Sequence, residues 1–346
     1  MASLDPQNRI GLWICILAAV GLITILLLLV KFIDFIRFHF VSASQPLAGY
    51  KANGLKQTFA LVTGASAGIG YGIAQALVNH GFGVILLGHQ EKELRESAAK
   101  LALLREDAKV KTIVMNACTA APTEIKTVIE KFVKDEQICI TVLVNNVGSN
   151  PIRHPPFREL STYDSEDIDA VINTNSRFMA HLTSVMLPIL SRPDGSDNNS
   201  PAFLRRRSLI LNISSGGMIG SPWLVVYSAT KAFNWSFSTS LARELAADES
   251  TKHIDSLCVV PGDVLSQGNS VWVTKWSPDS ERFGRLVVEK ADGALARGWR
   301  EVRPYWLHDL QYYLLQAIPE SRRARAVTDV LRRKKDAFNA IYGKEK

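Results

Sequence analysis

The stretch from Thr58 to Gly70, TFALVTGASAGIG, decides the fold of this chain. Its apolar first half, ending at Gly64, predicts a strand, and apolar residues at helical spacing begin at Ile69. Gly64 permits a sharp turn between the two, while Gly68 and Gly70 let the backbone approach a pyrophosphate at the helix N-terminus. A glycine-rich turn in this context predicts a dinucleotide site; a tight turn without a ligand is the alternative.

The rest of the chain continues to alternate short apolar runs with helical stretches. The expected strands are 59–64, 84–88, 110–116, 140–148, 208–215 and 254–262. The expected helices are 69–81, 91–103, 122–133, 167–190 and one around Tyr227. Such alternation predicts an α/β fold with right-handed crossovers, a doubly wound parallel sheet of the Rossmann type in a single domain.

An apolar run precedes this region. Residues 10–30 are 21 consecutive uncharged, mostly apolar residues, about the length that crosses a bilayer. A buried core helix would contain polar interruptions, and a cleaved signal peptide has a shorter apolar region, although residues 42–44 keep cleavage as an alternative. More Lys and Arg follow the run than precede it, which predicts a single-pass transmembrane anchor with the catalytic domain in the cytosol.

Charge and cysteine content exclude several classes of protein. Of the net charge of +7, residues 320–346 contribute +5, with nine Lys or Arg against four Asp or Glu. This asymmetry predicts a basic tail and argues against nucleic-acid binding. The four cysteines form no metal-binding pattern, so we expect no metal and a reducing compartment.

The candidate chemistry lies in Tyr227-Ser-Ala-Thr-Lys231. Residues four apart on a helix share a face, so a phenol and an ammonium would lie side by side. A neighbouring cation favours phenolate, and we therefore expect a lowered tyrosine pKa and a proton donor usable near neutrality. A Tyr-x-x-x-Lys pattern is common by chance, so its meaning depends on the surrounding motifs.

Together these motifs resemble the short-chain dehydrogenase/reductase family. They are TGxxxGIG at 63–70, NNVG at 145–148, Asn175, NISS at 212–215, YxxxK at 227–231 and PG at 261–262. The anchor, the NNVG form and RPYW at 303–306 are similar to one branch, the endoplasmic-reticulum very-long-chain 3-oxoacyl-CoA reductases and related 17β-hydroxysteroid dehydrogenases. The resemblance covers residues 58 to about 266.

The resemblance implies catalytic roles for individual residues. Tyr227 would protonate the carbonyl oxygen, and Lys231 would hold the nicotinamide ribose and depress the tyrosine pKa. Either Ser214 or Ser215 would orient the carbonyl, with Ser214 favoured by its separation from Tyr227. Asn175 would kink its helix and support a proton-relay water.

The resemblance also implies a set of cofactor-binding residues. They are Thr63, Gly64, Ser66, Gly68, Ile69, Gly70, His89, Asn116, Asn145, Val147, Gly148, Tyr227, Lys231, Pro261, Gly262, Val264 and Ser266. The second strand ends in Leu-Gly-His89-Gln without an acidic residue for a ribose 2′-hydroxyl, which favours NADPH over NADH. Asn116 replaces the family's adenine-binding Asp, and His89 stands where NADPH-dependent relatives often have Arg.

We therefore expect six regions: an N-terminal tail (1–9), a transmembrane anchor (10–30), a juxtamembrane linker (31–57), a catalytic domain (58–266), a substrate lid with extension (267–319) and a basic tail (320–346). The leading hypothesis is a reductase of long-chain 3-oxoacyl-CoA at the endoplasmic reticulum membrane, serving fatty-acid elongation. The alternatives are a steroid, retinoid or sphingoid dehydrogenase and a catalytically silent scaffold. The implied partners are a hydrophobic carbonyl substrate, the lipid bilayer, a second copy in a homodimer and elongation-complex proteins.

Overall fold

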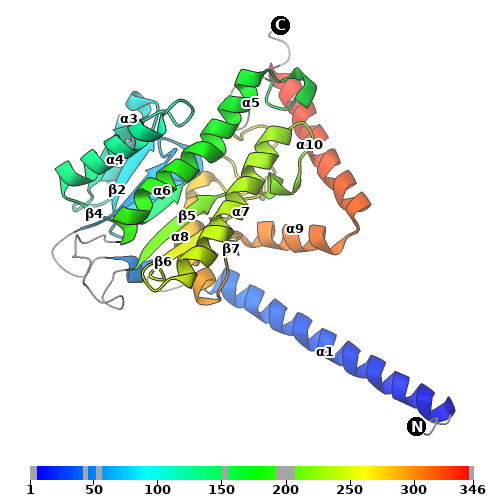
Figure 1. The fold of residues 1–346 in the computed structure, drawn as a ribbon. Helices are drawn as coiled ribbons and strands as arrows, with labels where there is room; N and C mark the ends of the chain where they lie inside the picture. The colour runs from blue at the N-terminus through cyan, green and yellow to red at the C-terminus, as the bar shows by residue number, and fades with distance from the viewer. Residues whose placement is uncertain (1–5, 42–45, 52–56, 150–154, 192–206, 343–346) are drawn as a thin grey trace. The chain divides into compact units, whose positions relative to one another are not determined.

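The computed structural model describes residues 6–41, 46–51, 57–149, 155–191 and 207–342 (Figure 1). The chain divides into two compact units, residues 1–42 and 43–346. The first contains α1 (Pro6–Phe40), in which Ile10–Phe40 is long and apolar enough to cross a membrane. The first five residues of the predicted N-terminal tail and the last four of the basic tail lie outside the described residues.

A seven-stranded parallel sheet forms the centre of the second unit. Its strands are β1 (Thr58–Thr63), β2 (Gly83–Gly88), β3 (Val110–Val114), β4 (Cys139–Asn145), β5 (Ser208–Ile213), β6 (Ile254–Val259) and β7 (Glu301–Val302). The strand order is β3-β2-β1-β4-β5-β6-β7, so the winding direction reverses between β1 and β4. This order confirms the predicted doubly wound parallel sheet.

The helices fall into two packed groups and a C-terminal extension. One group holds α2 (Gly68–Asn79), α3 (Glu91–Ala102) and α8 (Ser280–Ala296). The other holds α4 (Pro122–Glu136), α5 (Ser165–Ile172), α6 (Phe178–Ser191) and α7 (Val225–Ala247). The extension consists of α9 (Trp306–Ala317) and α10 (Glu320–Tyr342).

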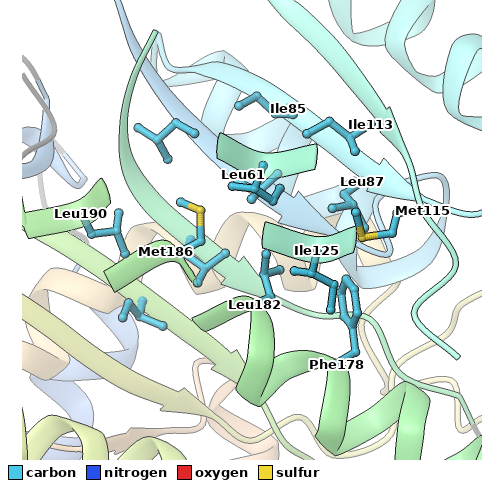
Figure 2. Close-up of a cluster of buried hydrophobic side chains, with 14 of the residues drawn as sticks. Leu61, Ile85, Leu87, Ile113, Met115, Ile125, Phe178, Leu182, Met186 and Leu190 are labelled. Carbon is cyan, nitrogen blue, oxygen red and sulfur yellow. The ribbon is translucent and has the colours of Figure 1, made fainter. Parts of the chain in front are cut away.

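The main hydrophobic core lies where α4 and α6 meet the sheet (Figure 2). On α6, Phe178, Leu182, Met186 and Leu190 recur every four residues and are at most 1% exposed. This spacing places them on one helix face, against strand residues such as Leu61. The strands of a parallel sheet are covered on both faces, which is why they read as continuous apolar runs in the sequence.

Two glycines allow α2 and α8 to touch through their backbones. A Cβ on Gly72 would lie 2.1 Å from the carbonyl oxygen of Ser280, and one on Gly284 would lie 2.1 Å from the carbonyl carbon of Gly72. No side chain fits in this contact. The close crossing fixes where α8 begins, and therefore where the loop between β6 and α8 ends.

Three features differ from the sequence-based expectations or extend them. The predicted helix 167–190 is divided into α5 and α6 by a π-helical turn at Asn173–Arg177. Strand β7 was not predicted because two residues carry no periodicity. Within the expected linker, Leu47 and Tyr50 are fully buried, and the Tyr50 hydroxyl donates to Asp255 at 2.7 Å.

Candidate active site

The glycine-rich turn lies at the carboxyl ends of the strands, where the winding direction reverses between β1 and β4. Gly64 and Gly68 have φ angles of +61° and +60°, a region that favours glycine. A Cβ on Gly70 would lie 2.3 Å from the carbonyl oxygen of Gly64. Each glycine of the motif is therefore required by the backbone of the turn itself.

The start of α2 is suited to a phosphate group. Its N-cap, Ala67, provides no side-chain hydrogen bond, and the first turn holds no acidic residue. The backbone N–H groups of a helix N-terminus bind phosphate when no side chain satisfies them. Ser66 and Ile69 flank this position, and the Ser66 carbonyl accepts a hydrogen bond of 2.7 Å from Ser97. The predicted pyrophosphate cradle thus fits a dinucleotide.

The end of β4 is fastened to the glycine-rich turn by Thr63. Its hydroxyl accepts hydrogen bonds from the backbone N–H groups of Asn146 at 2.9 Å and Val147 at 3.0 Å. The Asn146 amide in turn donates to the carbonyl oxygens of Thr63 and Gly64. Asn146 therefore has a structural role that the sequence motif alone did not specify.

The outer end of the cradle is open. His89 and Asn116, which follow β2 and β3, are both exposed. The Asn116 side-chain oxygen accepts a hydrogen bond of 2.9 Å from the Cys118 backbone N–H. One of its two acceptor positions is thus used by its own turn, leaving one for an adenine amine.

Tyr227 and Lys231 lie on the first turns of α7 and face the same site. The Lys231 ammonium is 5.8 Å from the centre of the Tyr227 ring and donates to the Ile213 carbonyl oxygen at 3.1 Å. A Cβ on Gly148 would lie 2.8 Å from this nitrogen. The glycine that ends the NNVG motif therefore leaves the space that the ammonium occupies.

The pKa values of this pair differ from the expectation. Burial lowers the pKa of Lys231 from 10.5 to about 8. Burial also raises the pKa of Tyr227, and only its hydrogen bond with Ser215 opposes this rise. The expected lowering of the tyrosine pKa is therefore wrong for the protein alone, because the phenolate would lose its hydration and the ammonium lies near the ring face.

The two candidate serines are placed differently. The Ser214 hydroxyl is 1% exposed and donates to the Lys231 carbonyl oxygen at 2.7 Å. The Ser215 hydroxyl accepts from the Gly217 backbone N–H at 3.1 Å and lies in hydrogen-bonding reach of Tyr227. The geometry therefore favours Ser215 over Ser214 as the serine that would contact a substrate carbonyl.

Asn175 lies in the π-helical turn between α5 and α6 and is fully buried. Its amide donates to the Ser149 carbonyl oxygen and to the Thr230 hydroxyl, both at 3.0 Å, and its side-chain oxygen accepts from the Ser149 backbone N–H at 2.8 Å. A Cβ on Gly148 would lie 3.4 Å from that oxygen. The structure thus brings Asn175 to the NNVG loop and to α7.

A buried polar ladder crosses the strands below the site. The Asn145 amide donates to the Asn212 side-chain oxygen at 2.8 Å and to Thr183 at 2.9 Å, and Asn212 donates to Ser238 at 3.0 Å. Because buried polar groups are costly without partners, this ladder holds β4, β5 and α7 in one arrangement. Thr183 and Ser238 were not predicted, since neither belongs to a local motif.

The loop after β6 completes the site. The Gly262 backbone N–H donates to His308 Nδ1 at 3.1 Å, and a Cβ on Gly262 would lie 2.6 Å from the imidazole ring. Farther along, Ser266 lies against the glycine-rich turn, with its Cβ 3.7 Å from the position of a Cβ on Gly68. Val264 is 3% exposed, and its carbonyl accepts from the Asn269 amide. His308, on α9, was not predicted as part of this region.

Comparisons with known proteins agree with this geometry. Residues 58–275 match the sequence profile described as short chain dehydrogenase. The chain is 30% identical over 292 residues to the very-long-chain 3-oxoacyl-CoA reductase of Candida albicans, covering 82% of this chain and 78% of that one. It is 29% identical over 336 residues to the reductase of the same name from Schizosaccharomyces pombe, covering 94% and 92%.

Solved structures share the fold. The 3-oxoacyl-[acyl-carrier protein] reductase from Brucella melitensis, in complex with NAD, gives a TM-score of 0.60 at 22% identity, covering 73% of this chain and 97% of that chain. A short-chain dehydrogenase from Sphingobium yanoikuyae, in complex with NADPH, gives a TM-score of 0.56 at 22% identity, covering 76% and 97%. At these identities the likeness establishes the arrangement of the sheet and helices.

Proposed function

This chain belongs to the short-chain dehydrogenase family, and we propose that it is a membrane-anchored reductase that transfers hydride from NADPH to the ketone of a long-chain 3-oxoacyl-CoA. The observation that carries the proposal is the convergence of Ser215, Tyr227 and Lys231 beside the glycine-rich turn at the start of α2. The substrate class is supported by relatives named very-long-chain 3-oxoacyl-CoA reductase, whose matches cover 82% and 94% of this chain.

The nicotinamide cofactor supplies the hydride when it is bound. In this chain, the Ser215 hydroxyl would donate a hydrogen bond to the ketone oxygen and stabilise the charge that develops there. Tyr227 would give its proton to the same oxygen. The Lys231 ammonium, close to the tyrosine ring and to Gly148, would favour the resulting phenolate and bind the ribose hydroxyls.

Asn175 would position this proton path. Its amide reaches Thr230 on α7 and the backbone of Ser149 in the NNVG loop. A buried side chain with three hydrogen bonds to two different segments fixes the position of those segments relative to each other. Through them it maintains the space around the Lys231 nitrogen.

The cofactor preference rests on charge at the end of β2. No acidic residue stands there to bind a ribose 2′-hydroxyl, and the exposed His89 is compatible with a 2′-phosphate. NADPH is therefore the proposed cofactor, with NADH as the weaker one. A direct comparison of the two dissociation constants tests this choice.

The proposed cellular setting follows from α1 and from the relatives. The apolar helix would anchor the chain in the endoplasmic reticulum membrane, with the catalytic unit in the cytosol. There it would meet long acyl chains at the membrane surface and would work beside the other enzymes of fatty-acid elongation, as a monomer or a homodimer. The basic α10 helix complements the negative charge of a cytosolic leaflet.

The proposal is tested with full-length protein purified in a mild detergent. NADPH oxidation is followed with a long-chain 3-oxoacyl-CoA, a short-chain 3-oxoacyl-CoA and a steroid ketone. We expect turnover with the long-chain substrate, and Tyr227→Phe should reduce it about 10²- to 10⁴-fold while leaving NADPH binding intact. Turnover of the steroid ketone, without turnover of either acyl-CoA, would refute the proposed substrate class and favour a steroid dehydrogenase. Full activity of Tyr227→Phe would refute the mechanism.

A further inference from the structure

The connection between β6 and α8 is a long loop without helix or extended strand. It runs from Val260 to Asp279 and is held together by several internal hydrogen bonds. One is the bond from the Leu265 backbone N–H to the Pro278 carbonyl oxygen at 2.9 Å, and another is the Ser266–Asn269 turn. Loops of this length in compact domains usually serve a function, and their ordering costs conformational entropy. This one lies against the phosphate-binding turn through Ser266.

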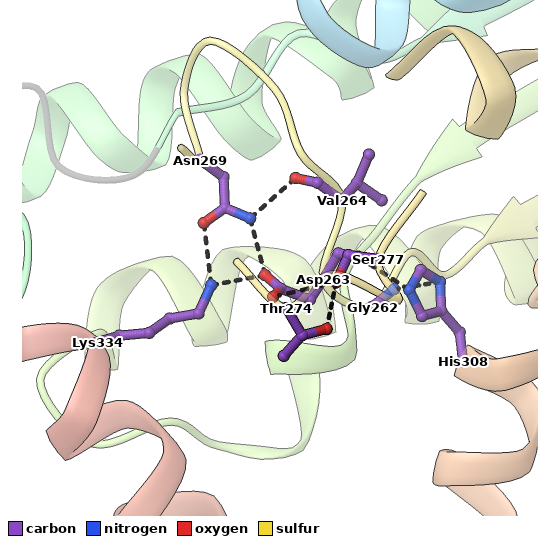
Figure 3. A network of polar contacts seen from close by, with 8 residues as sticks. All are labelled: Gly262, Asp263, Val264, Asn269, Thr274, Ser277, His308 and Lys334. Carbon is purple, nitrogen blue, oxygen red and sulfur yellow. Dashed lines mark hydrogen bonds and ion pairs between the residues drawn. The ribbon is translucent and has the colours of Figure 1, made fainter. Parts of the chain in front are cut away.

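Asp263 is the centre of a polar network in this loop (Figure 3). Its carboxylate accepts from Lys334 Nζ at 2.6 Å, from the Asn269 amide at 2.8 Å and from the Ser277 hydroxyl at 3.4 Å. Lys334 also donates to the Asn269 side-chain oxygen at 3.0 Å. The ammonium thus joins Asp263, at the start of the loop, to Asn269, at the end of the turn whose Ser266 lies against the glycine-rich turn.

This ion pair is partly shielded from solvent. The Lys334 side chain is 12% exposed and the Asp263 side chain 26% exposed. Hydrogen bonds that carry charge on both partners are stronger than neutral ones, and shielding reduces their screening by salt. Most surface ion pairs contribute little, whereas this pair ties two segments that are 71 residues apart in the chain.

Helix α10, which carries Lys334, is itself held in place on the same side of the molecule. The Phe338 ring lies 6.2 Å from the Phe157 ring, and the Lys335 ammonium lies 4.8 Å from the centre of the Trp223 ring. Trp223 belongs to the segment just before α7, which presents Tyr227. The helix therefore spans the loops on either side of the candidate active site.

A second attachment comes from α9. His308 Nδ1 accepts from the Gly262 backbone N–H, so its Nε2 carries the proton and donates to the Asp263 carbonyl oxygen at 3.0 Å. The imidazole is 5% exposed. The two helices of the extension thus hold consecutive residues at the start of the loop.

We propose that Lys334 is a positioning residue, which holds the loop after β6 against the dinucleotide turn and so preorganises the cofactor site. A loop already held in its bound position lowers the entropy that binding must otherwise overcome. The inference rests on the proposed function only in that the turn binds a dinucleotide. It does not depend on the identity of the ketone.

The test measures NADPH affinity on full-length protein by the change in nucleotide fluorescence. Lys334→Met keeps the length of the side chain and removes the charge, and it should raise the dissociation constant about five- to tenfold. Lys334→Arg keeps the positive charge, so its affinity for NADPH should stay within about twofold of that of the parent. Arg333→Met, on the exposed side of the same helix, is the matched control and should leave affinity unchanged.

Loop position is read separately by limited trypsin digestion. Lys275 lies in the loop and is exposed, so cleavage after it should be faster in Lys334→Met than in Arg333→Met or the parent. Added NADPH should slow that cleavage. If Lys334→Met fails to fold, Asp263→Asn is used in its place, since it removes the charge at constant shape.

Unchanged NADPH affinity and unchanged cleavage in Lys334→Met would overturn the proposal. Equal loss of affinity in Arg333→Met would also overturn it, because the effect would then come from general charge. Weaker NADPH binding in Lys334→Met, together with no turnover of any 3-oxoacyl-CoA by the parent, would support the inference and refute the proposed substrate.

Discussion

Replacing Lys231 with methionine is expected to stabilise the protein while abolishing turnover. The side chain is 4% exposed, and burial lowers its pKa from 10.5 to about 8. Each unit by which burial lowers the pKa corresponds to about 1.4 kcal/mol, so a charged ammonium at pH 7 costs the folded state about 3 kcal/mol. Its hydrogen bond to the Ile213 carbonyl returns about 1–2 kcal/mol, so the net gain in the variant is about 1–2 kcal/mol.

The stability that Lys231→Met gains over the parent should depend on pH, in a direction set by the lowered pKa of Lys231. Between pH 8 and 10.5 the unfolded chain holds a proton that the folded chain has released. The free energy of unfolding of the parent therefore rises with pH across this window. Below pH 8 both states are protonated and the difference between parent and variant stays constant. The advantage of the variant should shrink as pH approaches 10.5.

Thermal melting of the full chain in detergent, at pH 7 and at pH 9.5, measures this difference. A gain of 1–2 kcal/mol corresponds to a rise in Tm of about 2–4 °C for a domain of this size class. Lys131→Met, an exposed lysine on α4, is the control and should show neither the gain nor its pH dependence. A lower Tm for Lys231→Met than for the parent at pH 7, or a gap that does not narrow at pH 9.5, would refute the reasoning.

Four further substitutions test other parts of the site and its support. Ser215→Ala should lower kcat about 10²-fold, whereas Ser214→Ala should change kcat only a few-fold while lowering Tm; steady-state kinetics and melting curves separate the two. Gly262→Ala would place a methyl group 2.6 Å from the His308 ring, and we expect a loss of about 1–3 kcal/mol of stability by thermal melting. Tyr50→Phe removes a hydrogen bond of 2.7 Å to a carboxylate and should cost about 1–2 kcal/mol; an unchanged Tm would contradict a supporting role for this segment.

The order of strands and helices was predictable because each carries its own local signal. Apolar runs ending in glycine or asparagine indicated β1, β2 and β4. The glycines between Gly64 and Gly70 predicted the sharp turn whose positive φ angles the structure shows. The sites where prediction failed lack such a signal. Strand β7 is two residues long. The π-helical turn Asn173–Arg177 is entirely polar and interrupts the apolar spacing, and only the family resemblance implied a kink at Asn175.

The sequence by itself determined the fold class, the glycine-rich turn and the pairing of Tyr227 with Lys231 on one helix face, because these depend on residues close together in the chain. Only the tertiary structure decided which serine faces the tyrosine and in which direction burial shifts its pKa. It alone brought Lys334 to Asp263, 71 residues away. Burial and long-range contacts depend on how distant segments pack, and no spacing within a single segment encodes them.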